Sequence, residues 1–93
     1  MDELTKLRRQ LDRIDQVIVT ALGERMELLQ PITRVKKEEN VPIFAEKRDR
    51  EVLRHAKTFA KQYRLDQRFL QSVYKLIFEE AKRLQQKYLE EMD

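Results

Sequence analysis

Arg25 interrupts an otherwise apolar pattern in the first third of the chain. Apolar residues recur there at alternating intervals of three and four, which is typical of a helix whose narrow apolar face packs against other helices. These positions are Leu4, Leu7, Leu11, Ile14, Ile18, Ala21, Leu28, Ile32 and Val35, and Arg25 occupies the slot left between Ala21 and Leu28. A permanent cation on a packed face is costly unless an anion compensates it. The compensating anion is either a carboxylate on a neighbouring helix or an anionic ligand inside a helical bundle.

Lys36 and Arg8 are two further cations on the same helical pattern. Lys36 follows Arg25 by eleven residues, which is three turns plus about 20°, so both side chains point the same way and can converge on one ligand. Arg8 precedes Arg25 by 17 residues, roughly 25 Å along a helix axis. Arg8 therefore reaches the same ligand only from the second chain of an antiparallel dimer. The alternatives are a solvated lysine at position 36 and an exposed arginine at position 8.

Gln85 lies one turn after Ala81, beside the apolar positions of the last helical pattern. An amide at such a position needs hydrogen-bond partners if it is buried, and it is otherwise exposed. The chain has one His, His55, and no Cys. Metal-ligand spacing, a glycine-rich phosphate loop and a nucleophile motif are all absent from the sequence. We therefore expect neither a metal nor a cofactor.

Three helices must position these side chains, and the expected fold is all-α. The helices are expected over residues 4 to about 39, 46–63 and 67 to about 91, with a loop at 40–45. Asp66 is placed to cap the third helix. Pro31 lies inside the first pattern, where it either kinks the helix or ends it. The apolar spacing continues in phase beyond Pro31, which favours a kink.

The length of the first helix predicts a dimer. About 34 residues at 1.5 Å each give roughly 50 Å, whereas a compact domain of this size has a radius of gyration near 12 Å. A helix that long projects beyond a monomeric globule and leaves its apolar face in water. We expect residues 1–93 to form a single domain and two copies to form an intertwined homodimer.

Composition narrows the class of protein. Charged residues make up 40% of the chain and hydrophobic residues 41%, with one Gly and two Pro, which suits a helical protein and not a β architecture. Neither a signal peptide nor a membrane-spanning run is present, so we expect a cytoplasmic location. The net charge of +3 permits nucleic-acid binding without demanding it. A basic helical dimer that binds RNA or protein is the remaining non-enzymatic alternative, but it does not explain Arg25.

The ordered set of unusual residues resembles the all-helical class of chorismate mutase over nearly the whole chain. The matching segments are Leu7-Arg8-Arg9-Gln10-Leu11-Asp12-Arg13-Ile14-Asp15, Leu22-Gly23-Glu24-Arg25, Arg34-Val35-Lys36-Lys37, Val41-Pro42-Ile43, Arg48-Asp49, Leu65-Asp66 and Leu84-Gln85. The resemblance implies an intertwined dimer with two equivalent active sites. It also implies an isomerase of the shikimate pathway, which converts chorismate to prephenate in phenylalanine and tyrosine biosynthesis without cofactor or metal.

The resemblance assigns roles to four polar side chains. Arg25 would bind one carboxylate of chorismate, and Arg8 of the partner subunit would bind the other. Lys36 would donate to the ether oxygen and a carboxylate, and Gln85 would donate to the ether oxygen from the opposite side. Stabilising the charge that grows on this oxygen, and holding the reactive conformer, is what the rearrangement needs.

At the other end of the expected site the chain departs from the family pattern. Arg48 would line the pocket, and Asp49 stands where a glutamate usually accepts from the ring hydroxyl. Ala45 replaces an aspartate often found near this hydroxyl, and Ala81 replaces a small polar residue that often contacts a carboxylate. We expect activity with weaker or altered recognition of the hydroxyl end.

Two other enzyme classes on this scaffold resemble the chain as well. They are isochorismate-pyruvate lyases, which the stretch Leu22-Gly23-Glu24-Arg25-Met26 is similar to, and 4-amino-4-deoxychorismate mutases. These classes differ mainly around the ring substituents of the substrate, where Ala45 and Asp49 depart from the pattern. The sequence leaves the choice among the three substrates open.

Overall fold

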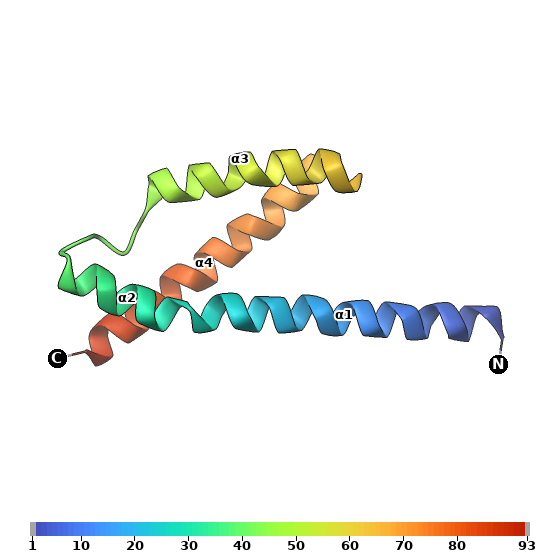
Figure 1. Cartoon of the computed structure of the whole chain (residues 1–93), viewed down its shortest axis with the longest axis horizontal. Helices are drawn as coiled ribbons and strands as arrows, with labels where there is room; N and C mark the ends of the chain where they lie inside the picture. Colours follow the sequence, from blue (N-terminus) through green and yellow to red (C-terminus); the bar gives the residue numbers. More distant parts are fainter. Residues whose placement is uncertain (1, 93) are drawn as a thin grey trace.

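The computed structural model describes residues 2–92, and all regular secondary structure in that range is α-helical. The helices are α1 (Glu3–Glu27), α2 (Leu29–Glu38), α3 (Glu46–Tyr63) and α4 (Gln67–Glu91). The bounds of α3 and α4 confirm those expected from the sequence. Figure 1 shows α3 and α4 as an antiparallel pair that opens toward α2, while α1 extends away from both.

The long first helix is divided at one residue, Leu28, which links α1 to α2 with φ −66° and ψ −19°. Pro31 is the third residue of α2, where a helix start has no intrahelical partner for the missing N–H. The proline ring crowds the carbonyl four residues back, at Glu27, and α1 ends there. The interruption thus precedes Pro31 by three residues, and α2 continues in the direction of α1 (Figure 1).

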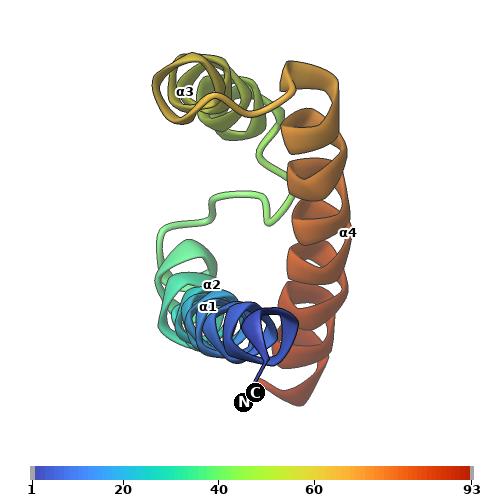
Figure 2. The same cartoon turned by 90° about the vertical axis from the view of Figure 1, so that its right-hand side faces the viewer.

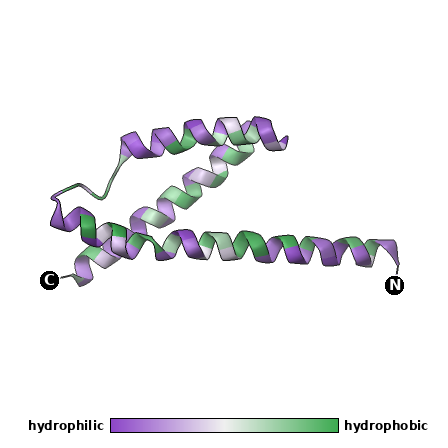
Figure 3. Ribbon diagram, viewed as in Figure 1, coloured by the Kyte–Doolittle hydropathy of each residue, from purple (hydrophilic) through white to green (hydrophobic). Residues whose placement is uncertain are grey.

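Helix α1 makes no core of its own. None of its residues is buried, and its apolar side chains are between 37% and 68% exposed from Leu4 to Leu22. Figure 3 shows that apolar residues nevertheless recur along the whole of α1. The radius of gyration is 16.9 Å and the longest dimension is 56 Å, well above the roughly 12 Å radius of a compact domain of this length.

The core lies where α4 packs on α3 and on α2 (Figure 2). Ala56 and Ala60 of α3 are 1% and 2% exposed, since small side chains allow two helices to approach closely. Leu29 and Thr33 of α2 and Phe78 of α4 are buried in the second contact. The Thr33 hydroxyl donates to the Leu29 carbonyl at 2.6 Å, so its polar atom is satisfied inside the core.

The helix ends follow local rules. Asp66 accepts from the backbone N–H of Phe69 at 2.8 Å, which confirms the expected cap of α4. Helix α3 begins after Ala45, which has no side chain able to cap it. None of the helices within residues 2–92 has the length and apolar character needed to span a membrane. The cytoplasmic location stays a prediction.

Candidate active site

A pocket of about 390 Å³ lies where the last turn of α1 and all of the other helices meet. Its polar lining consists of Arg25, Lys36, Arg48, Asp49, Lys82 and Gln85. Its apolar lining consists of Leu28, Leu29, Ile32, Ile43, Ala45, Phe78 and Ala81. Four cations and one carboxylate around an apolar floor suit a small anionic molecule with a hydrocarbon ring.

Lys36 joins three segments that are distant in sequence. Its Nζ donates to Gln85 Oε1 of α4 at 2.9 Å and to the carbonyl of Ile43, in the loop before α3, at 3.2 Å. An ammonium group has three N–H donors. Within the described residues these two bonds leave one N–H of Lys36 for a ligand.

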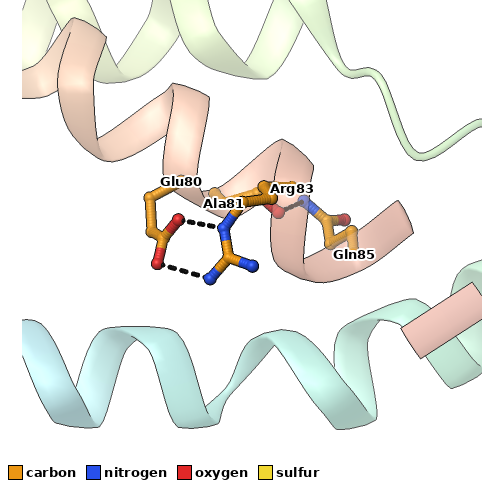
Figure 4. Close-up of polar contacts among 4 residues, drawn as sticks. All are labelled: Glu80, Ala81, Arg83 and Gln85. Carbon is orange, nitrogen blue, oxygen red and sulfur yellow. Dashed lines mark hydrogen bonds and ion pairs between the residues drawn. The ribbon is translucent and has the colours of Figure 1, made fainter. Parts of the chain in front are cut away.

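The side chain of Gln85 is buried, with 6% of its surface exposed. Of the two possibilities left open by the sequence, buried or exposed, the first is therefore correct. Its Nε2 donates to the carbonyl of Ala81 at 3.2 Å, the contact drawn in Figure 4, while its Oε1 accepts from Lys36. Two opposed bonds fix the amide, and one N–H of the NH₂ group remains for a ligand. The neighbouring cation Arg83 is instead engaged on the surface by Glu80, with Nε to Oε1 at 2.6 Å (Figure 4).

Burial lowers the pKa of Lys36 below the ordinary lysine value of 10.5, and the negative charge of Asp49 partly opposes this shift. Partial removal from water disfavours the charged form of an ammonium group. An anion placed next to Nζ has the opposite effect. Binding of an anion and protonation of Lys36 are therefore coupled.

The remaining residues expected from the sequence enter the pocket from two elements. Arg25 comes from the last turn of α1 and is half-buried. Arg48 and Asp49 come from the first turn of α3, where Arg48 also pairs with Glu51 in an exposed ion pair that contributes little to stability. The backbone carbonyl of Ala45 accepts from the N–H of Asp49 at 2.9 Å, so the backbone of Asp49 is fixed at the start of α3.

Arg8 is the one expected site residue that a single chain does not bring to the pocket. It is exposed on α1, 17 residues and roughly 25 Å along the axis from Arg25. Sequence reasoning also missed one polar pocket residue, Lys82. The signal was present, because Lys82 precedes Gln85 by three residues and such pairs share a helix face.

The pocket offers no ligand set for a metal ion. Asp49 is its single carboxylate, and neither His nor Cys lines it. Across residues 2–92, no group of three or more acidic, His or Cys side chains is placed to hold a metal. What the pocket can do with its side chains is bind an anion, orient it and stabilise negative charge that develops near Lys36 and Gln85.

Comparison with known proteins agrees with this geometry. The chain is 25% identical to the chorismate mutase of Methanocaldococcus jannaschii over 91 residues, which is 98% of this chain and 92% of that protein. It is 31% identical to the 4-amino-4-deoxychorismate mutase of Streptomyces venezuelae, over 90% of this chain and 82% of that one. Bifunctional chorismate mutase/prephenate dehydratases also match, and this chain spans 14% to 23% of their length.

A solved structure has the same fold. It is a conserved hypothetical protein from Pyrococcus furiosus, 35% identical, with a TM-score of 0.72 over 91% of this chain and 97% of that one. The family model for chorismate mutase type II matches residues 7–86, which include Arg8 and every pocket residue. The chain therefore belongs to the chorismate mutase type II family, and its enzyme class is that of an isomerase.

Proposed function

We propose that this protein is a chorismate mutase, which rearranges chorismate to prephenate within the shikimate pathway of the cytoplasm. The observation that carries the proposal is the Lys36–Gln85 pair. Its two groups are 2.9 Å apart in a pocket lined by cations, and each keeps an N–H donor for a ligand. Two convergent donors suit a single oxygen atom on which negative charge develops.

The reaction needs no group other than those of the substrate and the pocket. One C–O bond of chorismate breaks while one C–C bond forms in the same molecule, and no proton or electron is exchanged with the protein. Lys36 and Gln85 donate to the ether oxygen as that C–O bond lengthens. Arg25 binds a carboxylate through its planar fork, which also holds the side chain of the substrate over the ring.

Asp49 takes the remaining polar group of the substrate. A carboxylate repels the two carboxylates of chorismate but accepts a hydrogen bond from its hydroxyl, and Asp49 is the single acid of the pocket. Ala45, which precedes α3, adds no polar side chain there. We therefore place the ring hydroxyl near the first turn of α3.

We further propose that the active form is a homodimer without nucleic-acid or membrane partners. Helix α1 has apolar residues from end to end and none of them is buried, so a second α1 running antiparallel is a matching cover. In that arrangement Arg8 of the partner subunit approaches Arg25 and supplies the second carboxylate contact. The distance of roughly 25 Å along one helix supports this exchange.

A second candidate is 4-amino-4-deoxychorismate mutase, favoured by the 31% identity to the Streptomyces venezuelae protein of that name. The test is to incubate the purified protein separately with chorismate, 4-amino-4-deoxychorismate and isochorismate. We expect prephenate from chorismate at the highest kcat/KM. Preferred turnover of the amino compound selects the second candidate, and salicylate plus pyruvate from isochorismate indicates a lyase. No turnover of any of the three overturns the proposal.

A further inference from the structure

Lys82 is the fourth cation of the pocket, and it lies outside the Lys36–Gln85 pair. Its Nζ lies 5.7 Å from the centroid of the Phe44 ring, within the range of a cation–π contact. Both residues are exposed, so the ammonium group stands at the mouth of the pocket and not in its floor. The contact holds the long side chain of Lys82 toward the loop that precedes α3.

The position of Phe44 shows which side of the pocket Lys82 occupies. Phe44 is followed directly by Ala45, and the Ala45 carbonyl accepts from the backbone N–H of Asp49. Lys82 therefore lies on the side of the pocket formed by residues 43–49, which also carries Asp49. Ile43, which precedes Phe44, accepts from Lys36 through its carbonyl, and the charge of Asp49 also acts on Lys36, so this side of the pocket holds Lys36 as well.

The opposite charges of Asp49 and Lys82 affect which substrate the pocket prefers. A carboxylate alone accepts a hydrogen bond from a hydroxyl or an ammonium group, and it attracts the ammonium more strongly because of the charge. A cation at the same end of the pocket repels an ammonium and leaves a neutral hydroxyl almost unaffected. Asp49 with Lys82 thus suits a neutral donor better than Asp49 alone would.

We propose that Lys82 is a specificity-determining residue, which makes the pocket prefer the hydroxyl-bearing chorismate over 4-amino-4-deoxychorismate. This inference rests on the proposed function. The amino group of the second compound is positively charged at neutral pH, so it meets repulsion at the site where the hydroxyl of chorismate is accepted. Because Lys82 is solvated, the effect is screened by water and salt and is moderate in size.

The test compares kcat/KM for the two compounds in the wild type and in three variants. Lys82→Met keeps the length of the side chain and removes its charge, Lys82→Arg keeps the charge, and Lys82→Glu reverses it. We expect the ratio of chorismate to amino compound to fall about three- to tenfold in Lys82→Met and further in Lys82→Glu. In Lys82→Arg the ratio should stay within twofold of the wild type. Lys87→Met, an exposed lysine of α4 outside the pocket, is the matched control.

Two further readings separate charge from other causes. The wild-type ratio should decrease as salt is raised, since screening weakens repulsion at a solvated site, while the ratio of Lys82→Met should depend less on salt. A ratio that stays within twofold in both Lys82→Met and Lys82→Glu overturns the role of Lys82 and leaves the proposed function standing. A wild-type protein that converts neither compound overturns the proposed function, and this inference with it.

Discussion

Helix α1 and the pocket-bearing part of the chain, α2 to α4, share one amphipathic pattern but differ in what covers it. In α2 to α4, Ala56, Ala60 and Thr33 are at most 2% exposed, and Gln85 is buried with both ends of its amide bonded. In α1 no residue is buried, and Ile14 and Ile18 are 54% and 52% exposed. The same 3–4 spacing thus yields a closed core in one region and an open face in the other.

The difference separates two requirements of the site. Helices α2 to α4 set the geometry of Lys36 and Gln85 by themselves, through contacts within one chain. Helix α1 adds Arg25 at its end but carries Arg8 far from the pocket. If a second chain covers α1, the same contact that buries its apolar face also brings Arg8 to the pocket of the other chain. The site would then be complete only in the dimer.

The largest expected effect comes from two variants, each of which removes a different arginine of the proposed site. Arg25→Ala and Arg8→Ala should each lower kcat/KM about 10²- to 10³-fold, since each removes a charged contact to a carboxylate. When the two inactive variants are mixed and allowed to exchange chains, half of the dimers are mixed and each has one intact site. Activity should then return to about a quarter of the wild type.

The control for this experiment is Arg9→Ala, an exposed neighbour of Arg8, which should stay active alone. Failure of the mixture to regain activity, with chain exchange demonstrated, would show that Arg8 does not cross to the pocket of the other chain.

The next prediction breaks α1. Ile14→Glu places a carboxylate on the apolar face, and burying it without a partner costs several kcal/mol. We expect the dimer to dissociate at least 100-fold more readily, as measured by sedimentation equilibrium. Gln16→Glu adds the same group on the other side of the helix and should change the dissociation constant less than threefold. Equal behaviour of the two variants would contradict a dimer built on this face.

A third prediction uses the pKa of Lys36, which burial lowers from 10.5. The proposed mechanism uses the ammonium form of Lys36, so kcat/KM should fall on the alkaline side with a midpoint below 10.5. The free energy of unfolding should instead increase as pH rises through the same range. Between the lowered pKa and 10.5 the unfolded chain binds more protons than the folded one, so the free energy of unfolding contributed by this group rises with pH.

Lys36→Met tests the predicted pH dependence of stability, and Lys36→Arg tests that of activity. The wild type should gain stability relative to Lys36→Met as pH rises through this window, in urea titrations at fixed protein concentration. Any residual activity of Lys36→Arg should persist to higher pH than that of the wild type, because a guanidinium keeps its proton. A wild-type alkaline midpoint of kcat/KM at or above 10.5 would contradict the lowered pKa of Lys36.

The smallest expected effect concerns the start of α3. Ala45 occupies the N-cap position without a side-chain acceptor, so Ala45→Asn should raise the free energy of unfolding by about 1 kcal/mol. The matched change is Asp66→Ala, which removes an existing cap from α4 and should cost about the same. Denaturant titration measures both. A loss of stability in Ala45→Asn would mean that the asparagine cannot adopt the cap geometry.

Much of the local structure could be predicted from the sequence, because the signals are local. The spacing of apolar residues and the Asp66 cap were sufficient to predict α3 and α4 with their approximate ends. Pro31 indicated that the first helix is interrupted, but the sequence placed the interruption at the proline itself. The break falls at Leu28, since the steric conflict acts on the carbonyl of Glu27, one turn earlier.

The grouping of site residues was predicted through resemblance to a family and not through spacing. Of the eight residues expected at the site, seven line one pocket, and Arg8 lies outside it on the same chain. Their catalytic roles stay predictions. Spacing alone related Arg25 to Lys36, because both lie on one helical pattern, but it could not relate either of them to Gln85, which is 49 residues from Lys36.

The sequence by itself determined the helices, since hydrogen bonds within four residues and a repeating apolar face depend only on near neighbours. It also placed apolar residues along the whole of α1, which predicts a second chain as a cover, and this stays a prediction. Only the tertiary structure decided that Gln85 is buried and that its side-chain oxygen accepts from Lys36. The same holds for the contact between Lys82 and the ring of Phe44. Those contacts depend on how α4 crosses α2 and α3, and a crossing is set by the packing of side chains far apart in the chain.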